Sequence, residues 1–390
     1  MSPEDWQTVA DRFGLGQLVA MPSYVARGFM GEIWRLNTTG GRWAVKLLFP
    51  WADFGSRPSD VAIQIAAAAG GVRLPHPVLT PDGDAVIDTT EHQVRVHEWV
   101  DVSSEPLTTP VSAEIAADAG HQLGLLHRLA IPPVAETDPW FIGAPAANEW
   151  SDLTKRATAA HAVWAPAFAA KRATITELSR HIAPASGRSV ITCHRDFHPG
   201  NVFPSAADGK LVVLDWENAG GLEAERELGY ALFAWSCGSG TFDPATANAL
   251  IDGYAAATGS EPILTPELFA TAVATHLNIL QAMADQALGG SEHAGFAEEE
   301  LSHLLGHYLD DLLHLVSLPI TDMIGPAHVT TVPPNTVPDN TVPPNTAPAN
   351  TAESDTASAD TASADTASAD TASADTASAD TASADTAPAG

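Results

Sequence analysis

Hydrophobic and polar residues alternate in short runs over the first hundred positions, which is the pattern of half-buried strands. Three runs read SYVARG, EIWRLNT and RWAVKLLF, and Thr39-Gly40-Gly41 between the last two is a hairpin signal. Two further strands are expected around Asp84–Asp88 and His92–Trp99. An alanine-rich stretch from Ser59 to Ala69, ended by Gly70-Gly71, predicts one helix. The pattern therefore predicts a small antiparallel sheet with a helix.

From residue 111 onward, apolar residues recur at the spacing of a helix instead. In VSAEIAADAGHQLGLLHRL, one helical face carries Ile115, Ala119, Leu123 and Leu126. Three later segments share this pattern: 151–182, 265–287 and 296–317. One short β island is expected between helices, with strands at Val190–Ile191 and Leu211–Leu214 and a polar motif between them. These elements predict an α+β class with a small β lobe and a larger helical lobe.

The last sixty or so residues have a different composition. From Thr331 the chain reads TVPPNTVPDNTVPPNTAPAN, and the unit TASAD then repeats from Thr356 to Asp385. Such a segment offers little apolar surface to offset the entropy of ordering, so we expect a disordered acidic tail. We therefore divide the chain into an N-terminal lobe at 1–100, a helical lobe at 101–325 and a tail at 326–390.

Charge and composition narrow the possible partners. The net charge is −30, and all 18 Lys and Arg residues lie at or before Arg226. Nucleic acid is a poor partner for such a chain, because binding phosphates needs clustered cations. A cationic small molecule would suit it, although solubility explains the same numbers. Cys193 and Cys237 form no metal-binding or disulfide pattern and are expected to be buried thiols. With neither a signal peptide nor a membrane span apparent, we expect a cytoplasmic protein.

The residues with the clearest chemistry lie in HRDFHPGN at 194–201 and in VVLDWE at 212–217. They contain Asp196, Asn201 five positions later and Asp215 fourteen positions after that. Phosphoryl transfer needs one carboxylate to orient the attacking hydroxyl and accept its proton, and oxygen ligands to hold Mg²⁺ on the ATP phosphates. Asp196 fits the first role, and Asn201 and Asp215 fit the second.

The motif HRDFHPGN resembles the catalytic loop of protein-kinase-like enzymes. The segments LDWENAG and ELGYAL that follow resemble the aminoglycoside-phosphotransferase branch, a family of small-molecule kinases. The DFG and APE motifs of protein kinases do not occur. The resemblance spans roughly residues 20–320 and implies a two-lobed, protein-kinase-like fold, with ATP as donor, Mg²⁺ as cofactor and a small-molecule hydroxyl as acceptor.

The resemblance also assigns nucleotide-binding residues in the first lobe. Lys46, at the end of the apolar run WAVK, is similar to the lysine that holds the ATP phosphates. Gly28 and Gly31 lie where a phosphate-covering loop is expected. Glu98 and Val100 lie in the segment RVHEWV, which resembles the lobe connector, and their backbone would pair with adenine.

One part departs from the family pattern. The kinase lysine usually pairs with a glutamate on the next helix, but SDVAIQIAAAAGG contains none. Asp60 and Gln64 are the candidate partners of Lys46, and their spacing does not choose between them. Glu217 is equally compatible with a role near the metal and with a solvated loop.

Two other functions remain open from the sequence. His194, Asp196 and His198 alternate as HxDxH and could bind a transition metal in a metal-dependent hydrolase. That function would leave Lys46 and Asn201 unexplained. A pseudokinase that binds nucleotide without transferring phosphate is the other alternative, supported only by the missing helix glutamate.

Overall fold

The computed structural model describes residues 1–27, 31–49, 59–89, 92–105, 107–184, 187–238, 240–290 and 294–323. Gly28 and the segment 326–390 therefore lie outside the described residues. The predicted boundaries of the lobes and of the tail stay predictions.

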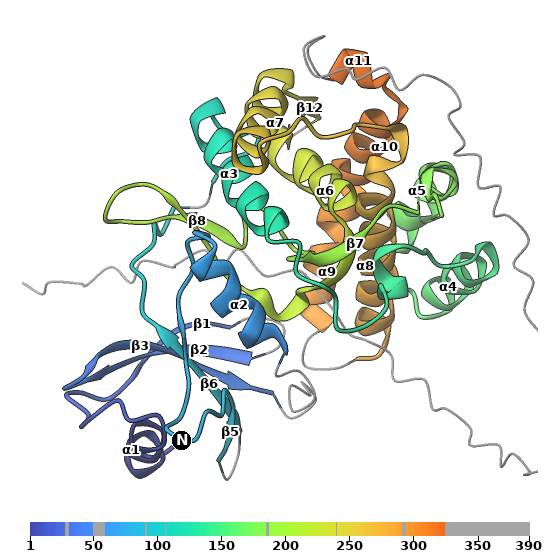
Figure 1. Cartoon of the computed structure of the whole chain (residues 1–390). Coiled ribbons are helices and arrows are strands. Elements are labelled where there is room, and N and C mark those ends of the chain that lie inside the picture. The colour runs from blue at the N-terminus through green and yellow to red at the C-terminus, as the bar shows by residue number, and fades with distance from the viewer. Residues whose placement is uncertain are drawn as a thin grey trace, which may run out of the picture. The chain divides into compact units, whose positions relative to one another are not determined.

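The first lobe is the antiparallel sheet predicted by the alternating pattern (Figure 1). The strands pair in the order β1-β2-β3-β6-β4, and β5 also pairs with β6. Two helices accompany them. Their bounds are α1 Pro3–Arg12, β1 Ser23–Arg27, β2 Gly31–Thr38, β3 Gly41–Leu48, α2 Ser59–Ala69, β4 Pro77–Val78, β5 Ile87–Asp88 and β6 Gln93–Glu98.

Apolar side chains on one face of this sheet form the core of the lobe. Leu36, Val45 and Val94, from three neighbouring strands, are completely buried. They pack with Val9 of α1, a helix whose first turn is closed by a capping box. The polar residues that alternate with them therefore point to the other face of the sheet.

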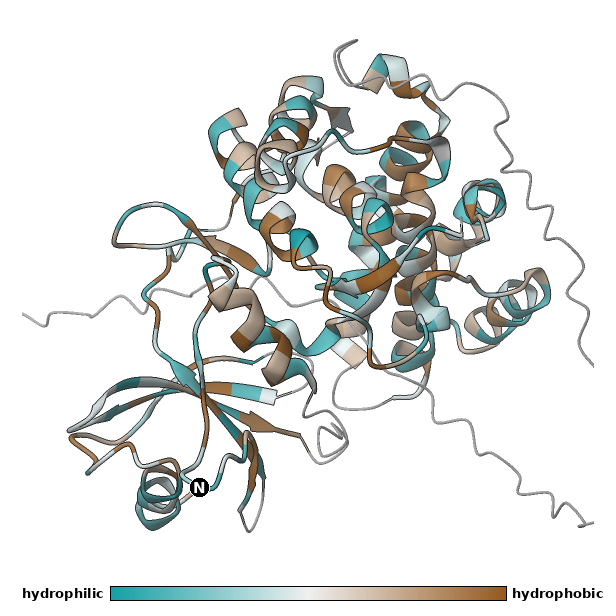
Figure 2. Cartoon of the chain, viewed as in Figure 1, coloured by the Kyte–Doolittle hydropathy of each residue, from teal (hydrophilic) through white to brown (hydrophobic). Residues whose placement is uncertain are grey.

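The remaining described residues are mostly helical, as the apolar spacing predicts (Figure 1). Figure 2 shows that the hydrophobic colouring on these helices is concentrated where they pack together. Their bounds are α3 Ala113–Arg128, η1 Pro139–Phe141, α4 Ala147–Ala159, α5 Ala165–Leu178, η2 Ser179–His181, α6 Ala224–Ser236, α7 Pro244–Thr258, η4 Pro266–Phe269, α8 Ala270–Leu288, α9 Ala294–His303, the π-helix η5 Leu304–Tyr308, α10 Leu309–Ser317 and α11 Ile320–Met323.

Helices α3 and α7 approach closely because glycines line their contact. A β-carbon added to Gly120 would lie 1.9 Å from the carbonyl oxygen of Leu250, and one added to Gly253 would lie 2.0 Å from that of Ala117. Side chains are therefore excluded at both positions. This close packing fixes the end of α3 beside α6 and α7.

The prediction of a single β island was wrong, because the strands form two separate ribbons. Strand β7 (Val190–Cys193) pairs with β10 (Gly220–Glu223), and β8 (Val202–Pro204) pairs with β9 (Leu211–Val213). The segments expected to be partners thus belong to different ribbons. The polar 194–201 loop connects the two ribbons, and residues 214–219 connect them a second time.

Three further observations complete the fold. Cys193 and Cys237 are buried and free, as predicted. A last pair of short strands, β11 (Cys237–Gly238) and β12 (Thr241–Phe242), follows α6. In the described part of the chain, no helix combines the length and the apolar character needed to cross a bilayer.

Candidate active site

Asp196 lies in the 194–201 loop and is 6% exposed. Its Oδ2 accepts hydrogen bonds from Nδ2 of Asn201 at 2.8 Å and from Nδ2 of Asn218 at 3.2 Å. Its Oδ1 lies 3.2 Å from Nε2 of His198 and 3.4 Å from the hydroxyl of Tyr230, which donates to it. The carboxylate is therefore held from several directions by polar side chains.

These contacts decide the charge of Asp196. Burial by itself would raise the pKa of this carboxyl, but the adjacent His198 and the hydrogen bonds outweigh it and hold the pKa below its ordinary value. The same pairing raises the pKa of His198 against the opposite effect of its burial. Asp196 is consequently a carboxylate near neutral pH, which can accept a proton.

Asn201 is oriented by the groups it contacts. Its Nδ2 donates to both the backbone carbonyl of Asp196, at 3.1 Å, and the Oδ2 of that residue, at 2.8 Å. Because these oxygens can only accept, the amide nitrogen must face them. The amide oxygen of Asn201 is thereby turned away from Asp196. The backbone carbonyl of Asn201 accepts from the N–H of Leu214 at 2.8 Å, which brings the next residue, Asp215, beside this loop.

Backbone conformation marks both ends of this arrangement. Arg195 and Asp215 have φ angles of 66° and 53°. This left-handed region is uncommon for residues other than glycine and is frequent at functional sites. One of the two is thus the predicted site residue Asp215 itself, and the other directly precedes Asp196.

Glu227 on α6 binds the backbone at the start of the 194–201 loop. It is completely buried and accepts the backbone N–H of His194 at 3.1 Å, together with that of Arg195. Its Oε2 also lies 2.7 Å from Nε2 of His127 on α3, whose Nδ1 is 3.0 Å from the hydroxyl of Tyr254. Burial would raise the pKa of Glu227, but these partners lower it. Motif spacing does not reveal this role; the only signal is an acid inside the apolar ELGYAL helix.

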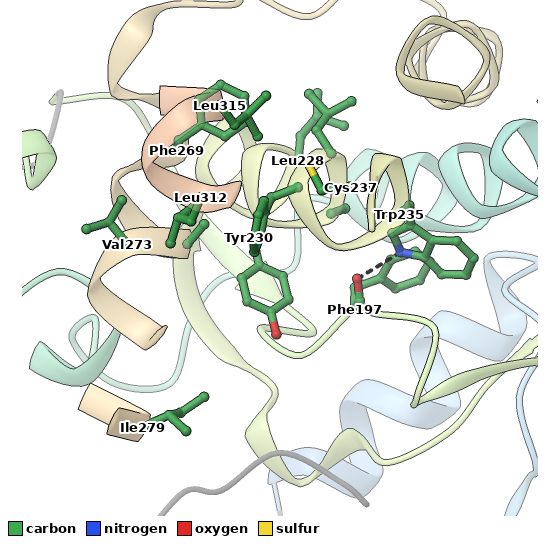
Figure 3. Packing of buried hydrophobic residues seen from close by; sticks show 14 of the residues in the cluster. Phe197, Leu228, Tyr230, Trp235, Cys237, Phe269, Val273, Ile279, Leu312 and Leu315 are labelled. Carbon is green, nitrogen blue, oxygen red and sulfur yellow. Dashed lines mark hydrogen bonds between the residues drawn. The ribbon is translucent and has the colours of Figure 1, made fainter. Parts of the chain in front are cut away.

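Tryptophan packing fixes the middle of the loop. The indole Nε1 of Trp235 donates to the backbone carbonyl of Phe197 at 3.1 Å, as Figure 3 shows. The two rings also pack together, with centroids 5.8 Å apart. Both side chains belong to the main hydrophobic core. The backbone next to Asp196 is therefore fixed by core packing.

Lys46 faces two acids that follow strand β9. Its Nζ lies 2.5 Å from Oε1 of Glu217 and 3.7 Å from Oδ1 of Asp215. Burial would lower the pKa of Lys46, but the two carboxylates raise it, so the ammonium remains charged. Glu217 is thus a direct partner of Lys46 rather than a solvated loop acid.

Neither candidate on α2 pairs with Lys46. Asp60 binds Arg95, with Oδ2 2.5 Å from Nη1, and both side chains are only 3% exposed. Gln64 instead places its Oε1 3.1 Å from Nε2 of His97. Residues four apart on a helix lie on one face, and so do residues two apart on a strand. Asp60 and Gln64 of α2 therefore both pair with residues of β6, and neither pairs with Lys46 of β3.

Lys46, Asn201 and Asp215 line one cavity of about 280 Å³, which we call the Lys46 cavity. Its lining comes from the β lobe, α2 and both polar segments of the helical lobe. The lining residues are Ala26, Arg27, Ile33, Ala44, Lys46, Gln64, Pro75, Arg95, His97, Gly200, Asn201, Phe203, Leu214, Asp215, Trp216 and Glu217.

Other residues expected at the nucleotide do not line this cavity. Glu98 and Val100 are described but are not part of its wall, and the backbone N–H of Glu98 donates to the carbonyl of His76. Gly31 has a structural reason to be glycine, since a β-carbon there would lie 2.2 Å from the carbonyl oxygen of Leu47. Their predicted roles stay predictions.

The alternative metal motif does not assemble. Nε2 of His194 donates to the carbonyl of Leu214 at 2.9 Å, and the ring packs against Trp216. Nδ1 of His198 accepts the N–H of Gly200 at 3.0 Å. Among the described residues, the group with metal-ligand spacing is His127, Cys193 and Glu227. His194, Asp196 and His198 do not converge on a common point.

A family model described as "Phosphotransferase enzyme family" matches residues 24–266. No curated protein sequence matches the chain.

Solved structures give the fold. A spectinomycin phosphotransferase in complex with ADP and spectinomycin is 13% identical, with a TM-score of 0.60 over 81% of this chain and 98% of that chain. An amicoumacin kinase with AMP-PNP and Ca²⁺ bound is also 13% identical, with a TM-score of 0.50 over 80% of this chain and 97% of that one. A microcompartment-associated aminopropanol kinase is 13% identical, with a TM-score of 0.51 over 81% and 98%. These likenesses confirm the predicted two-lobed, protein-kinase-like α+β fold.

Proposed function

Because the chain belongs to the phosphotransferase enzyme family, we propose that it transfers the γ-phosphoryl group of ATP to a hydroxyl group of a small molecule in a Mg²⁺-dependent reaction. The enzyme class predicted from the sequence, a phosphotransferase with an alcohol group as acceptor, is confirmed by this membership. The donor, the metal and the roles of individual residues are our proposal. In it, residues 1–100 bind the nucleotide and residues 101–325 carry the catalytic and acceptor groups.

One observation carries the proposal. Lys46, Asn201 and Asp215 come from three distant parts of the sequence and line the same cavity. Asn201 is at the same time hydrogen-bonded to Asp196. A cation for phosphates, two oxygen ligands for a metal and a carboxylate base therefore lie within one connected cluster, as phosphoryl transfer requires.

The donor set fits a hard cation. The amide oxygen of Asn201 is turned away from Asp196, and the Asp215 carboxylate lines the same cavity while remaining 32% exposed. Carboxylate and amide oxygens are ligands that suit Mg²⁺. When bound, Mg²⁺ would neutralise charge on the donor phosphates. We propose Asn201 and Asp215 as its ligands. We propose the nearby Glu217 as the residue that holds Lys46 when Mg²⁺ and nucleotide are absent.

The protein's own residues would act as follows. Lys46 stays protonated and offers positive charge to the phosphates. Asp196 stays ionised, so it can hydrogen-bond an acceptor hydroxyl and take its proton. Asn218 and Tyr230 hold the carboxylate and limit its rotation. Gly28, Gly31, Glu98 and Val100 remain proposed contacts of the nucleotide, with Glu98 and Val100 acting through their backbone.

The acceptor is proposed at the level of a chemical class. Spectinomycin and aminopropanol, named with the similar enzymes, are amine-bearing alcohols. The acidity of this chain suits such cations, so an amine-bearing alcohol is the first class to test. The residues of the hydrolase alternative, His194, Asp196 and His198, do not form a group with metal-ligand spacing among the described residues. The pseudokinase alternative predicts binding without turnover.

Two measurements test the proposal. Calorimetric titration of the full chain with AMP-PNP should give binding that strengthens when Mg²⁺ is present. A panel of amine-bearing alcohols, incubated with ATP and Mg²⁺, should give a phosphorylated product in at least one case. Nucleotide binding without product across a broad hydroxyl panel would favour a pseudokinase, and absence of binding at millimolar nucleotide would refute the proposal.

A further inference from the structure

Three side chains next to the start of the 194–201 loop are of types that bind transition metals. They are His127 in the last turn of α3, Cys193 at the end of β7 and Glu227 near the start of α6. One ligand atom from each lies within 4.8 Å of the other two. All three side chains are buried. Segments that are distant in the sequence thus bring a nitrogen, a sulfur and an oxygen atom together.

This donor set differs in kind from the oxygen ligands of the Lys46 cavity. Thiolate and imidazole ligands suit Zn²⁺, whereas Mg²⁺ prefers oxygen ligands such as those of Asn201 and Asp215. Zinc bonds of about 2.0–2.3 Å place tetrahedral ligand atoms roughly 3.3–3.7 Å apart. The three ligand atoms would therefore need shifts on the order of 1 Å to bind zinc. Side-chain rotations can supply shifts of this size.

The contacts of His127 allow its ring to change from a hydrogen-bond donor to a metal ligand. Its Nε2 lies 2.7 Å from Oε2 of Glu227, and its Nδ1 lies 3.0 Å from the hydroxyl of Tyr254. A neutral imidazole carries one proton, which can lie on either nitrogen. With the proton on Nδ1, the ring donates to the Tyr254 oxygen, and the lone pair of Nε2 can bind a metal. A metal-binding histidine usually donates its other N–H to a protein partner in this way.

Glu227 can bind a metal without releasing the loop. Its Oε2 accepts the backbone N–H of His194 at 3.1 Å and also faces His127, while its Oε1 accepts the backbone N–H of Arg195. Each carboxylate oxygen has two lone-pair positions. A metal would take the position on Oε2 that His127 occupies, so both backbone hydrogen bonds can remain.

Charge balance favours a divalent ion in this buried position. The Sγ of Cys193 donates to the carbonyl of Leu222 over 3.5 Å, a long contact, so little is lost when the thiol proton leaves. Burial and the nearby Glu227 raise the pKa of this thiol well above its ordinary value, so it is protonated without a metal. A bound metal would displace that proton to solvent. The two positive charges of the ion are then matched by one thiolate and one carboxylate, with the imidazole neutral, and no unpaired charge is buried.

We propose that His127, Cys193 and Glu227 form a zinc-binding site that ties α3, β7 and α6 together at the start of the 194–201 loop. Zinc in proteins is mostly four-coordinate, so a water molecule would complete the set. Bound zinc would link residues as far as 100 positions apart and stabilise the backbone that precedes Asp196. The three residues are separate from the proposed Mg²⁺ ligands, and the inference does not depend on the proposed function.

Co²⁺ is the probe, because a bond between Co²⁺ and a thiolate absorbs in the near ultraviolet. The full chain, reduced and freed of metal with a chelator, is titrated with Co²⁺ in excess Mg²⁺. One equivalent should produce the absorption, and Zn²⁺, which binds such sites more tightly, should abolish it. The chain contains two cysteines, which supply a matched pair of variants. Cys193→Ser should lose the absorption, and Cys237→Ser, the control, should keep it.

A second variant and a second readout test the other ligands. In His127→Gln the amide can still donate to Glu227, but the imidazole ligand is lost, so Co²⁺ affinity should fall by about tenfold or more. Zn²⁺ should raise the melting temperature of wild-type protein and of Cys237→Ser, by more at higher zinc concentration. It should leave the melting temperature of Cys193→Ser unchanged.

Three results would overturn the inference. Absence of the absorption in excess Co²⁺ would show that the three residues do not bind the metal. Its loss in Cys237→Ser, with retention in Cys193→Ser, would place the thiolate ligand at Cys237. Full Co²⁺ affinity in His127→Gln would exclude His127 as a ligand. Thermal melting without metal checks folding, and Cys193→Ala carries the same comparison should Cys193→Ser not fold. Because no nucleotide is used, failure of the proposed phosphotransfer would not affect these results.

Discussion

The 194–201 loop and the surroundings of Lys46 both bury charged groups, but they hold them in different ways. In the loop, Asp196 and the backbone are held by Asn201, Asn218 and Glu227. None of these partners has to leave for Asp196 to accept a proton. Around Lys46, the partners are Glu217 and Asp215, one of which we propose as a metal ligand.

The difference indicates which part of the site is preorganised and which part must change. The loop rests on the packed core through Phe197 and Trp235, so its geometry is set by folding. Lys46, by contrast, would exchange a carboxylate for donor phosphates on binding Mg²⁺ and nucleotide under the proposed function. Such an exchange costs little, because the lysine passes from one anion to another.

The strongest test of the comparison is Asp196→Asn. Asparagine keeps the size of the side chain but cannot take the hydroxyl proton, so kcat should fall by about 10²-fold or more. Nucleotide affinity should stay nearly constant, since Asp196 is not part of the wall of the Lys46 cavity. Steady-state kinetics with one acceptor and separate calorimetry measure both quantities. Retention of near-full kcat would show that this loop does not carry the catalytic base.

Asp215→Ala should affect the surroundings of Lys46 and leave the 194–201 loop intact. Removing a proposed metal ligand should weaken Mg²⁺-dependent nucleotide binding by about tenfold or more. Binding measured in EDTA should change much less. Lys46 retains Glu217 at 2.5 Å, so the melting temperature should move only slightly. Equal losses of nucleotide affinity with and without Mg²⁺ would instead show that Asp215 contributes only through its charge and not as a metal ligand.

Glu227→Gln should damage the loop through stability. A glutamine cannot accept from all the donors that surround Glu227, and it places an N–H against one of them. A loss of about 1–3 kcal/mol in unfolding free energy is expected near neutral pH. Chemical denaturation measures it, with the exposed Glu299→Gln on α9 as control.

The pH dependence of this loss sharpens the assignment. The pKa of Glu227 is lowered in the folded state from its ordinary value of 4.5. Its contribution to stability is therefore complete above that value and declines as the pH falls through the folded-state pKa. The difference between wild type and Glu227→Gln should shrink over the same interval. A difference that grows on acidification would contradict an ionised Glu227.

The smallest effect is expected from shortening the chain near residue 326. The removed segment contains no lysine, arginine or aromatic residue and repeats a five-residue unit. The melting temperature should stay within about two degrees, because such a segment offers little apolar area to bury. Nucleotide affinity should be unchanged as well. A large drop in melting temperature would show that the tail stabilises the folded part.

The elements, the fold class and the enzyme family could all be predicted from the order of residues along the chain. Alternating and helical spacing predicted the sheet and the helices because burial of one face requires those periods. The order of Lys46, Asp196, Asn201 and Asp215 carried the resemblance to phosphotransferases, and the family match confirmed the family. The residue roles within the site stay predictions.

The partners of the charged and polar groups became clear only from the folded arrangement. Glu227 lies 33 residues after His194, whose backbone N–H donates to it. Lys46 pairs with Glu217, and neither Asp60 nor Gln64 contacts it, because their spacing on α2 matches alternate residues of β6. Strand β7 pairs with β10, and β9 pairs with β8, whereas the local pattern suggested that β7 and β9 belong to one island. Periodicity records which face of an element is buried, whereas these pairings depend on which elements folding brings against that face.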